Sequence, residues 1–192
     1  MPRKTSRPLF ILVIGVAGSG KTTLAKEILR RRSAVYLDNN YIVDAFFPHT
    51  RNGAAYMKLR PRFYRALYTI AEENLKVGND VVLDVPHVKE IQDPKWRRFI
   101  KRLAKRAKSR IVVIRCTCSE ALLRSRLVHR GEPRDRWKLA HWREFLREQP
   151  QNVPITFAHL NIDTEKNLSG NAAAVVRYLK LYDQPCSQRK CL

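Results

Sequence analysis

The residues best suited to chemistry lie in one short loop, between Gly15 and Thr22. The loop reads Gly-Val-Ala-Gly-Ser-Gly-Lys-Thr and fits the pattern G-x-x-x-x-G-K-[ST] at every fixed position. Glycines allow the backbone to curl, so that successive N–H groups point inward at phosphate oxygens. Lys21 would then reach the β and γ phosphates of a nucleoside triphosphate, and the Thr22 hydroxyl would ligate Mg²⁺. The expected nucleotide-binding residues of this segment are Gly15, Gly18, Ser19, Gly20, Lys21, Thr22 and Thr23.

Two acids are expected to lie near this loop, because each closes a short predicted strand. Phosphoryl transfer needs a metal and a carboxylate that positions the acceptor hydroxyl. Asp38 is the candidate that orients or deprotonates the acceptor; the alternative is an Asp that caps the helix after it. Asp84 would support Mg²⁺ together with Thr22, or orient substrate; the alternative is a turn-forming acid before Pro86. Asp44 is a weaker third candidate and is expected at the surface.

A group of arginines supplies the cations that such a reaction needs at the γ-phosphate. Arginine stays charged at any working pH and grips phosphate with two parallel hydrogen bonds. A glycine and a proline interrupt the helical pattern within the group, as in a mobile lid, and Arg130 and Arg134 are the expected catalytic members beside Lys21 and Asp38. A surface charge cluster is the alternative. The four arginines lie within eleven residues, at positions 126, 130, 134 and 136.

The elements that must position these residues alternate between strand and helix along the chain. The apolar run Leu9–Ile14 predicts a strand buried on both faces, and a helix with Leu24 and Ile28 on one side follows the loop. Short strands that alternate with helices indicate a parallel sheet covered on both faces, with ligands at the carboxyl ends of the strands. The other strands are expected at 33–38, 80–84, 110–116 and, weakly, 159–164. The other helices are expected at 61–77, opened by Pro61, and at 95–108, 119–129, 137–147 and 172–181.

The loop, the acid-ended strands at Asp38 and Asp84 and the segment 126–135 together resemble the small P-loop kinases. More narrowly, they resemble the AAA-type single-domain ATP-binding proteins related to chloramphenicol phosphotransferase, gluconate kinase, zeta toxin and polynucleotide 5′-hydroxyl kinase. The resemblance spans about residues 9–165. It implies an α/β P-loop NTPase three-layer sandwich, a five-stranded parallel sheet in the order 2-3-1-4-5 and ATP-dependent transfer to a hydroxyl.

The same resemblance implies roles for individual residues. Asp38 matches the acceptor-site acid, the arginines match a lid near 126–147, and Arg126 or Arg130 would stack on adenine. The sequence also departs from relatives in this group. The acid-x-acid pattern of shikimate and gluconate kinases is replaced by Asp38-Asn39-Asn40, and no strand ends in the Asp-Glu pair of motor ATPases.

Composition predicts one globular domain, residues 1–185, with a frayed tail at 186–192. No apolar run is long enough for a membrane span, and the basic N-terminus leads into a strand and not into a secretory signal. The four cysteines, at 116, 118, 186 and 191, form no metal-binding or disulfide pattern, so reduced thiols in a cytoplasmic protein are expected.

The formal charge of +21 favours anionic partners. The densest basic run, 95–108, has apolar residues at helical spacing, so it predicts a helix with one basic face. A solvated outer face is favoured over a nucleic-acid surface, because no base-stacking aromatics interleave with the basic residues.

Three functions fit these features, and the first is favoured. The first is a kinase that moves the γ-phosphate of ATP to a hydroxyl of a small molecule such as a metabolite, nucleoside or antibiotic. The second is a polynucleotide 5′-hydroxyl kinase, and the third is a non-catalytic or regulatory ATP-binding protein. The basic residues near the predicted acceptor pocket point to an anionic acceptor; neither its identity nor the oligomeric state follows from the sequence. The pocket is expected to comprise Asp38, Tyr41, Phe46, Phe47, His49, Arg51, Tyr56, Lys58, Arg60 and Arg62.

Overall fold

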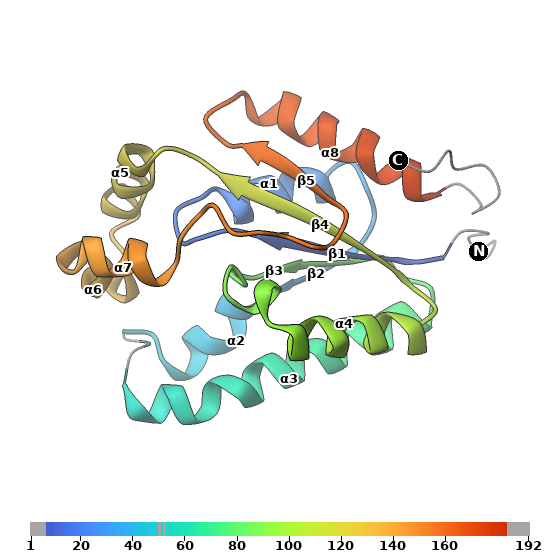
Figure 1. The fold of residues 1–192 in the computed structure, drawn as a ribbon, viewed down its shortest axis with the longest axis horizontal. Coiled ribbons are helices and arrows are strands. Elements are labelled where there is room, and N and C mark those ends of the chain that lie inside the picture. Colours follow the sequence, from blue (N-terminus) through green and yellow to red (C-terminus); the bar gives the residue numbers. More distant parts are fainter. Residues whose placement is uncertain (1–6, 50, 52, 184–192) are drawn as a thin grey trace.

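A five-stranded parallel sheet forms the centre of the fold, as a computed structural model of residues 7–49, 51 and 53–183 describes it (Figure 1). The strand order is β2-β3-β1-β4-β5, which confirms the predicted order 2-3-1-4-5. Each predicted strand is present within two residues of its expected ends. The strands are β1 (Leu9–Ile14), β2 (Val35–Asp38), β3 (Val81–Asp84), β4 (Arg110–Thr117) and β5 (His159–Asp163).

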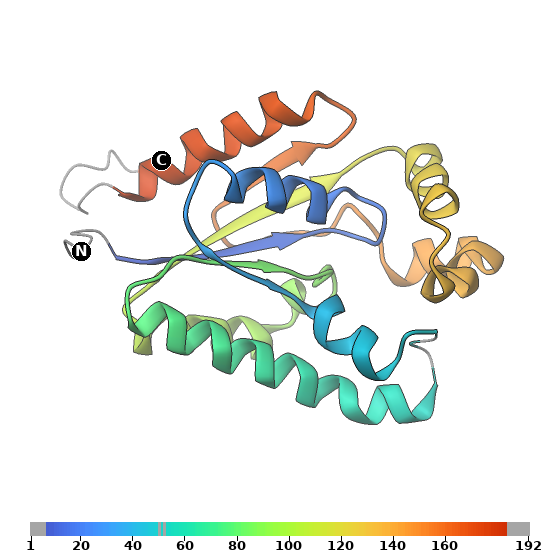
Figure 2. The same cartoon turned by 180° about the vertical axis from the view of Figure 1, so that it is seen from behind.

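Helices cover both faces of the sheet, which gives the predicted three layers. Helices α1 (Lys21–Leu29) and α8 (Leu168–Asp183) pack on one face, and α3 (Ala54–Lys76) and α4 (Pro94–Arg106) pack on the other (Figures 1 and 2). Strand β1 separates two hydrophobic cores. Its odd-numbered residues Leu9, Ile11 and Val13 belong to the α1/α8 core, and its even-numbered residues Phe10, Leu12 and Ile14 belong to the α3/α4 core. All six are fully buried, as expected for a central strand of a parallel sheet.

The start of α3 was predicted wrongly. The helix begins at Ala54, and Pro61 lies inside it and does not open it. The preceding segment is rich in good helix formers (Ala54, Ala55, Met57, Lys58, Leu59 and Arg60), so the helix forms ahead of the proline. Pro61 is exposed, where water can bond the carbonyl that its missing N–H leaves free. The predicted end near Gly78 is correct, since Gly78 has a φ of 94° just after the helix.

The segment 137–147 is not one helix as predicted. It forms α6 (Arg136–Ala140) and α7 (Trp142–Glu148), which are separated at His141. Phe145 of α7 is buried in the core, whereas α6 has no buried residue. The change of direction at His141 therefore lets α7 insert its apolar side chain while α6 stays at the surface. Helix α8 also begins earlier than predicted, at Leu168.

The remaining predicted elements agree with the structure. Helix α4 has Asp93 as its N-cap and buries Ile100 and Leu103, so the predicted basic helix is amphipathic. Two further helices are α2 (Asn39–Phe46) and α5 (Glu120–Arg130), and short 3-10 turns lie at Glu90–Gln92 and Pro133–Asp135. No helix among the described residues is long and apolar enough to span a membrane. The predicted frayed tail 186–192, with Cys186 and Cys191, lies outside the described residues.

Register brings the carboxyl ends of three strands to one edge of the sheet. Asp38 of β2 pairs with Asp84 of β3, and Asp84 pairs in turn with Val13 of β1, two residues before Gly15. The two acids that close their strands therefore lie beside the glycine-rich loop that follows β1. This is the arrangement expected for a ligand site in an open parallel sheet.

Candidate active site

The loop from Gly15 to Gly20 has a backbone that only glycine adopts readily. Gly15, Gly18 and Gly20 have φ values of 149°, 85° and 80°. A Cβ on Gly15 would lie 2.5 Å from the Cys116 carbonyl oxygen and 2.5 Å from the Ser19 Oγ, so a side chain cannot fit there. A backbone of this kind can turn N–H groups toward an anion at the start of a helix. In this structure the Gly15 N–H donates to the Pro86 carbonyl and the Ser19 N–H to the Val16 carbonyl.

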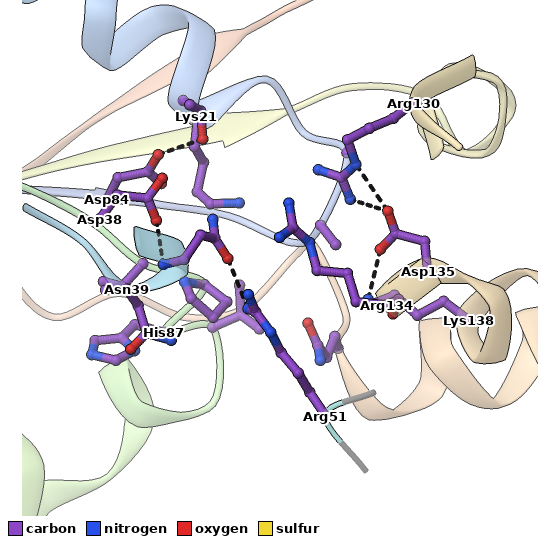
Figure 3. A pocket seen from close by; sticks show the side chains of 18 of the residues that line it. Lys21, Asp38, Asn39, Arg51, Asp84, His87, Arg130, Arg134, Asp135 and Lys138 are labelled. Atoms are coloured by element: carbon purple, nitrogen blue, oxygen red, sulfur yellow. Dashed lines mark hydrogen bonds and ion pairs between the residues drawn. The ribbon is translucent and has the colours of Figure 1, made fainter. Parts of the chain in front are cut away.

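Lys21 leads from this loop into the cavity, as Figure 3 shows. Its Nζ donates to the Val16 carbonyl at 2.9 Å. Burial lowers the pKa of the Lys21 ammonium, and the nearby Asp84 carboxylate partly offsets that effect. Ser19 is fully buried, and its Oγ has no partner among the described residues. Of these two residues Lys21 lines the cavity, whereas the Ser19 hydroxyl is buried behind it.

Two buried carboxylates lie next to the loop and are joined by one tyrosine. The Thr22 Oγ1 donates to the Asp84 Oδ2 at 2.5 Å, and the Tyr36 hydroxyl lies 3.1 Å from the same oxygen. The Tyr36 hydroxyl is also 3.2 Å from the Asp38 Oδ2. Burial raises the pKa of Asp84, while Lys21 acts to lower it. Tyr36 was not predicted, although it is two residues before Asp38 in β2 and thus on the same side of the strand.

Asp38 also has the capping role that was the alternative for this residue. Its Oδ1 accepts from the Asn40 backbone N–H at 2.8 Å, and Asp38 is the N-cap of α2. Its other oxygen, Oδ2, is the one near the Tyr36 hydroxyl, and Asp38 itself lines the cavity. One carboxylate thus begins a helix and still presents an oxygen on the side of the glycine-rich loop.

Hydrogen bonds hold the Arg126 side chain between the glycine-rich loop and the end of β5. Its guanidinium donates to the Gly18 carbonyl at 3.3 Å, to the Thr164 Oγ1 at 2.9 Å and to the Thr164 carbonyl at 2.8 Å. Arg136 is exposed. Arg126 is therefore part of the wall at the start of α1, whereas the other predicted lid arginines come from across the cavity.

Arg130 and Arg134 point into the cavity from the lid side, opposite Lys21 (Figure 3). Arg130 pairs with Asp135, whose carboxylate is buried and also accepts from the Lys138 Nζ at 2.7 Å. Arg134 pairs with Asp44 of α2. Both lid arginines are thus held by a carboxylate in this structure.

Asp44 is not the plain surface residue that the sequence suggested. It is half-buried between Arg134 and Arg51, and Arg51 also donates to the Asn40 Oδ1 at 2.7 Å. Burial acts to raise the pKa of Asp44, but the two guanidiniums outweigh it and lower that pKa. Asp44 therefore links the lid to the helix that Asp38 caps.

These groups surround one cavity of about 1300 Å³. Of the predicted acceptor residues, Asp38, His49, Arg51, Tyr56 and Arg60 line it. Tyr41, Phe46, Phe47, Lys58 and Arg62 do not; Tyr41 and Phe46 are 63% and 65% exposed. Lining residues that were not predicted include Asn39, Tyr64, His87, Lys89, Glu90 and Lys138. His87 had one usable signal, since it follows a predicted strand at the carboxyl edge of the sheet.

A family model described as an AAA domain matches residues 10–151. The chain belongs to this AAA-domain family. The match includes the glycine-rich loop, both strand-end acids and the arginines of the lid, which fits the predicted resemblance to P-loop proteins. A comparison with curated protein sequences found no match.

Solved structures share the fold of this AAA-domain protein at low sequence identity. A protein described only as a candidate kinase, from Chloroflexus aurantiacus, is 20% identical with a TM-score of 0.71, covering 93% of this chain and 100% of its own. A sugar kinase from Janibacter is 14% identical with a TM-score of 0.66, covering 90% and 95%. A gluconokinase from Sinorhizobium meliloti is 17% identical with a TM-score of 0.57, covering 93% and 95%. At these identities the likeness concerns the fold.

Proposed function

We propose that this protein is an ATP-dependent phosphotransferase that moves the γ-phosphate of ATP to a hydroxyl of a small molecule. The observation that carries the proposal is the convergence on one cavity of the glycine-rich loop, the buried carboxylate Asp38 and the lid arginines Arg130 and Arg134. Solved structures with this fold include proteins named as sugar kinase and gluconokinase, which supports the reaction type.

In this proposal, residues of the loop and of the lid together neutralise the negative charge of the transferred phosphoryl group. Loop N–H groups and Lys21 would hold the phosphates, and Arg126, Ser19 and Thr23 would line the nucleotide site. Arg130 and Arg134 would stabilise the charge that develops on the γ-phosphate oxygens. Both arginines are now paired with Asp135 and Asp44, so ATP must compete with a carboxylate for each of them.

Thr22 and Asp84 fit the requirements of Mg²⁺. A hydroxyl and a carboxylate 2.5 Å apart at the start of α1 match a hard cation that binds one or two protein oxygens besides the phosphates and water. Bound there, the ion would neutralise charge on the β and γ phosphates. Among the described residues no larger cluster of His, Cys, Asp or Glu could hold a metal.

Asp38 is the residue that we assign to the acceptor hydroxyl, which it would orient or deprotonate. The charges around the cavity support an anionic acceptor. Ten lysines and arginines but only five carboxylates line it, so a formal excess of five positive charges remains. MgATP carries fewer negative charges than that excess, which leaves room for an anionic group on the acceptor.

The test is transfer of radiolabelled phosphate from ATP to a panel of hydroxyl-bearing compounds that includes sugars, sugar acids, nucleosides, antibiotics and oligonucleotides. Lys21→Ala should nearly abolish transfer, because the γ-phosphate loses its fixed cation. Lys26→Ala is the matched control, since Lys26 is an exposed lysine of the same helix outside the cavity. Full activity of Lys21→Ala would refute the proposal.

A further inference from the structure

His87 is a buried, strained residue of the cavity wall that the proposed reaction does not use. It is 1% exposed and lines the cavity directly after β3. Its φ of 36° is unusual for a residue with a side chain. Its Nδ1 has no hydrogen-bond partner among the described residues. A strained backbone and an unsatisfied buried nitrogen are both costly, and such features concentrate at functional sites.

The neighbours of His87 favour one tautomer of its ring. The Trp96 Nε1–H donates to the Tyr68 hydroxyl at 2.8 Å, so that hydroxyl is free to donate its own proton to the His87 Nε2. Burial lowers the pKa of His87 to about 4, so the ring is neutral near pH 7. A neutral ring that accepts at Nε2 has its proton on Nδ1. In this tautomer the unpartnered atom is an N–H donor.

A hydrogen-bond acceptor faces this donor across a short gap. The Glu90 Oε2 lies 3.8 Å from the His87 Nδ1, too far for a direct hydrogen bond. The other oxygen of Glu90 accepts from Arg60 at 2.6 Å, which holds the carboxylate in place. Both His87 and Glu90 line the cavity. A hydroxyl suits this pair chemically, because its oxygen accepts one hydrogen bond from an N–H and donates another to a carboxylate.

We propose that His87 and Glu90 bind a second, unreactive hydroxyl of the acceptor, so that the acceptor belongs to the polyhydroxylated small molecules, such as sugars, polyols and sugar acids. The inference rests on the phosphotransferase function proposed above. Two further cavity-lining residues support it, since each has an unpartnered buried atom: the Asn39 Oδ1 is an acceptor and the Arg51 Nε is a donor.

The first test reads the tautomer without any need for activity. In ¹⁵N-histidine spectra of the whole protein, the His87 signals are assigned as those that disappear in His87→Asn. We expect a protonated Nδ1 and an unprotonated Nε2, and we expect Tyr68→Phe to shift the Nε2 signal. Tyr68 is thus a positioning residue. A wild-type ring protonated at Nε2 would overturn the proposal, because no donor would then face Glu90.

The second test compares two substitutions, each of which places a side-chain amide near the position of one of the two ring nitrogens. His87→Asn keeps an N–H near the Nδ1 position and suits the left-handed backbone. His87→Gln reaches the Nε2 position and loses the Nδ1 donor. We expect His87→Gln to weaken binding of a polyhydroxylated ligand and its kcat/KM about ten- to hundredfold, and His87→Asn to recover much of that loss. Thermal melting of both variants identifies any loss of folded protein.

Removal of the hydroxyl from the ligand separates recognition from a merely structural role. In wild type, the deoxy analogue should have a binding affinity and a kcat/KM about ten- to hundredfold lower than the parent ligand. In His87→Gln the same change of ligand should cause little further loss, because both changes remove the same hydrogen bond. Equal costs in both proteins would indicate a bound water in the gap and overturn the inference. So would transfer to simple mono-alcohols with no binding of polyhydroxylated compounds, although the phosphotransferase function would stand. Absence of transfer to any hydroxyl would reject that function, and ligand binding would still test His87.

Discussion

At the scale of single residues, Asp38 and Asp84 share a tyrosine but differ in their surroundings. Asp84 touches Thr22 and is near Lys21, on the nucleotide side, whereas Asp38 begins α2 on the acceptor side. This difference is why we assign the metal to one carboxylate and the acceptor to the other. Substitution can separate the capping role of Asp38 from its proposed chemical role, because asparagine caps helices as well as aspartate does.

Asp38→Asn should lower the rate of phosphoryl transfer by roughly 10²- to 10⁴-fold, the usual contribution of a general base. The melting temperature should change little, since the amide oxygen can still accept from the Asn40 N–H. Steady-state kinetics and thermal melting measure the two effects. Asp93→Asn is the matched control, because Asp93 caps α4 in the same way and does not line the cavity. Unchanged turnover in Asp38→Asn would favour a non-catalytic ATP-binding protein.

His87 gives a prediction for stability against pH. Its pKa is about 4 in the folded protein, because burial disfavours the charged ring, and about 6.5 in the unfolded chain. Between these values the unfolded chain binds the extra proton, so the free energy of unfolding should fall as pH drops from about 6.5 to about 4, by about 3 kcal/mol at most. Urea denaturation at several pH values measures this loss. His87→Asn should lack this component, and an unchanged pH profile in that variant would contradict the assignment.

The candidate site residues that follow from local sequence patterns could be predicted. Those that depend on packing between distant segments were missed. Lys21 could be found from the pattern of the glycine-rich loop, and Asp38 and Asp84 could be found because each closes a short apolar strand. His87 could be located at that edge, but its tautomer depends on Tyr68 and Trp96, which come from two different helices. Contacts between such distant segments follow from the packing of helices on a sheet, and one sequence does not specify them.

At the scale of elements, the lid is connected to the acceptor side of the cavity through Asp44. Arg134 belongs to the turn between α5 and α6, whereas Asp44 lies on α2, which begins at Asp38. A lid was predicted at this turn because Gly131 and Pro133 interrupt the helical pattern there. The pairing of Arg134 with Asp44 could not be predicted, because it joins segments 90 residues apart. The break at His141 could not be predicted either, because it goes with the burial of Phe145 by α7.

Removal of Arg130 and Arg134 together should lower kcat by roughly 10²- to 10³-fold and change the ATP dissociation constant much less. Lid cations act mainly on charge that develops in the transition state. In the ground state both are already engaged by Asp135 and Asp44, which reduces their contribution to ATP binding. The matched control is Arg143→Ala with Arg147→Ala, which removes the same charge from exposed positions of α7 outside the cavity. A change in ATP affinity alone would show that the lid role is wrong.

At the scale of the whole molecule, the charge of +21 is concentrated in part on the outer face of α4. The apolar side of this helix is buried against the sheet, so the basic side is the face that it presents to solvent. Arg106 is paired with Glu72 of α3. A line of cations suits the backbone of a nucleic acid, so this surface is the feature behind the alternative of a polynucleotide 5′-hydroxyl kinase. The exposed cations of this helix and its C-terminal end are Lys95, Arg98, Lys101, Arg102, Lys105, Arg106 and Lys108.

Salt dependence distinguishes a small-molecule acceptor from a polynucleotide 5′-hydroxyl acceptor. For a small acceptor bound inside the cavity, we expect KM to depend on salt much less than for an oligonucleotide. We also expect kcat/KM to be unchanged by the triple substitution Arg98→Ala, Arg102→Ala and Lys105→Ala. These positions face solvent on α4 and do not line the cavity. An oligonucleotide acceptor held by α4 would instead lose affinity steeply with salt, with a slope of about −0.7 for each single-strand phosphate contact. The triple variant would then reduce that slope by about two, which would make the polynucleotide kinase the better assignment.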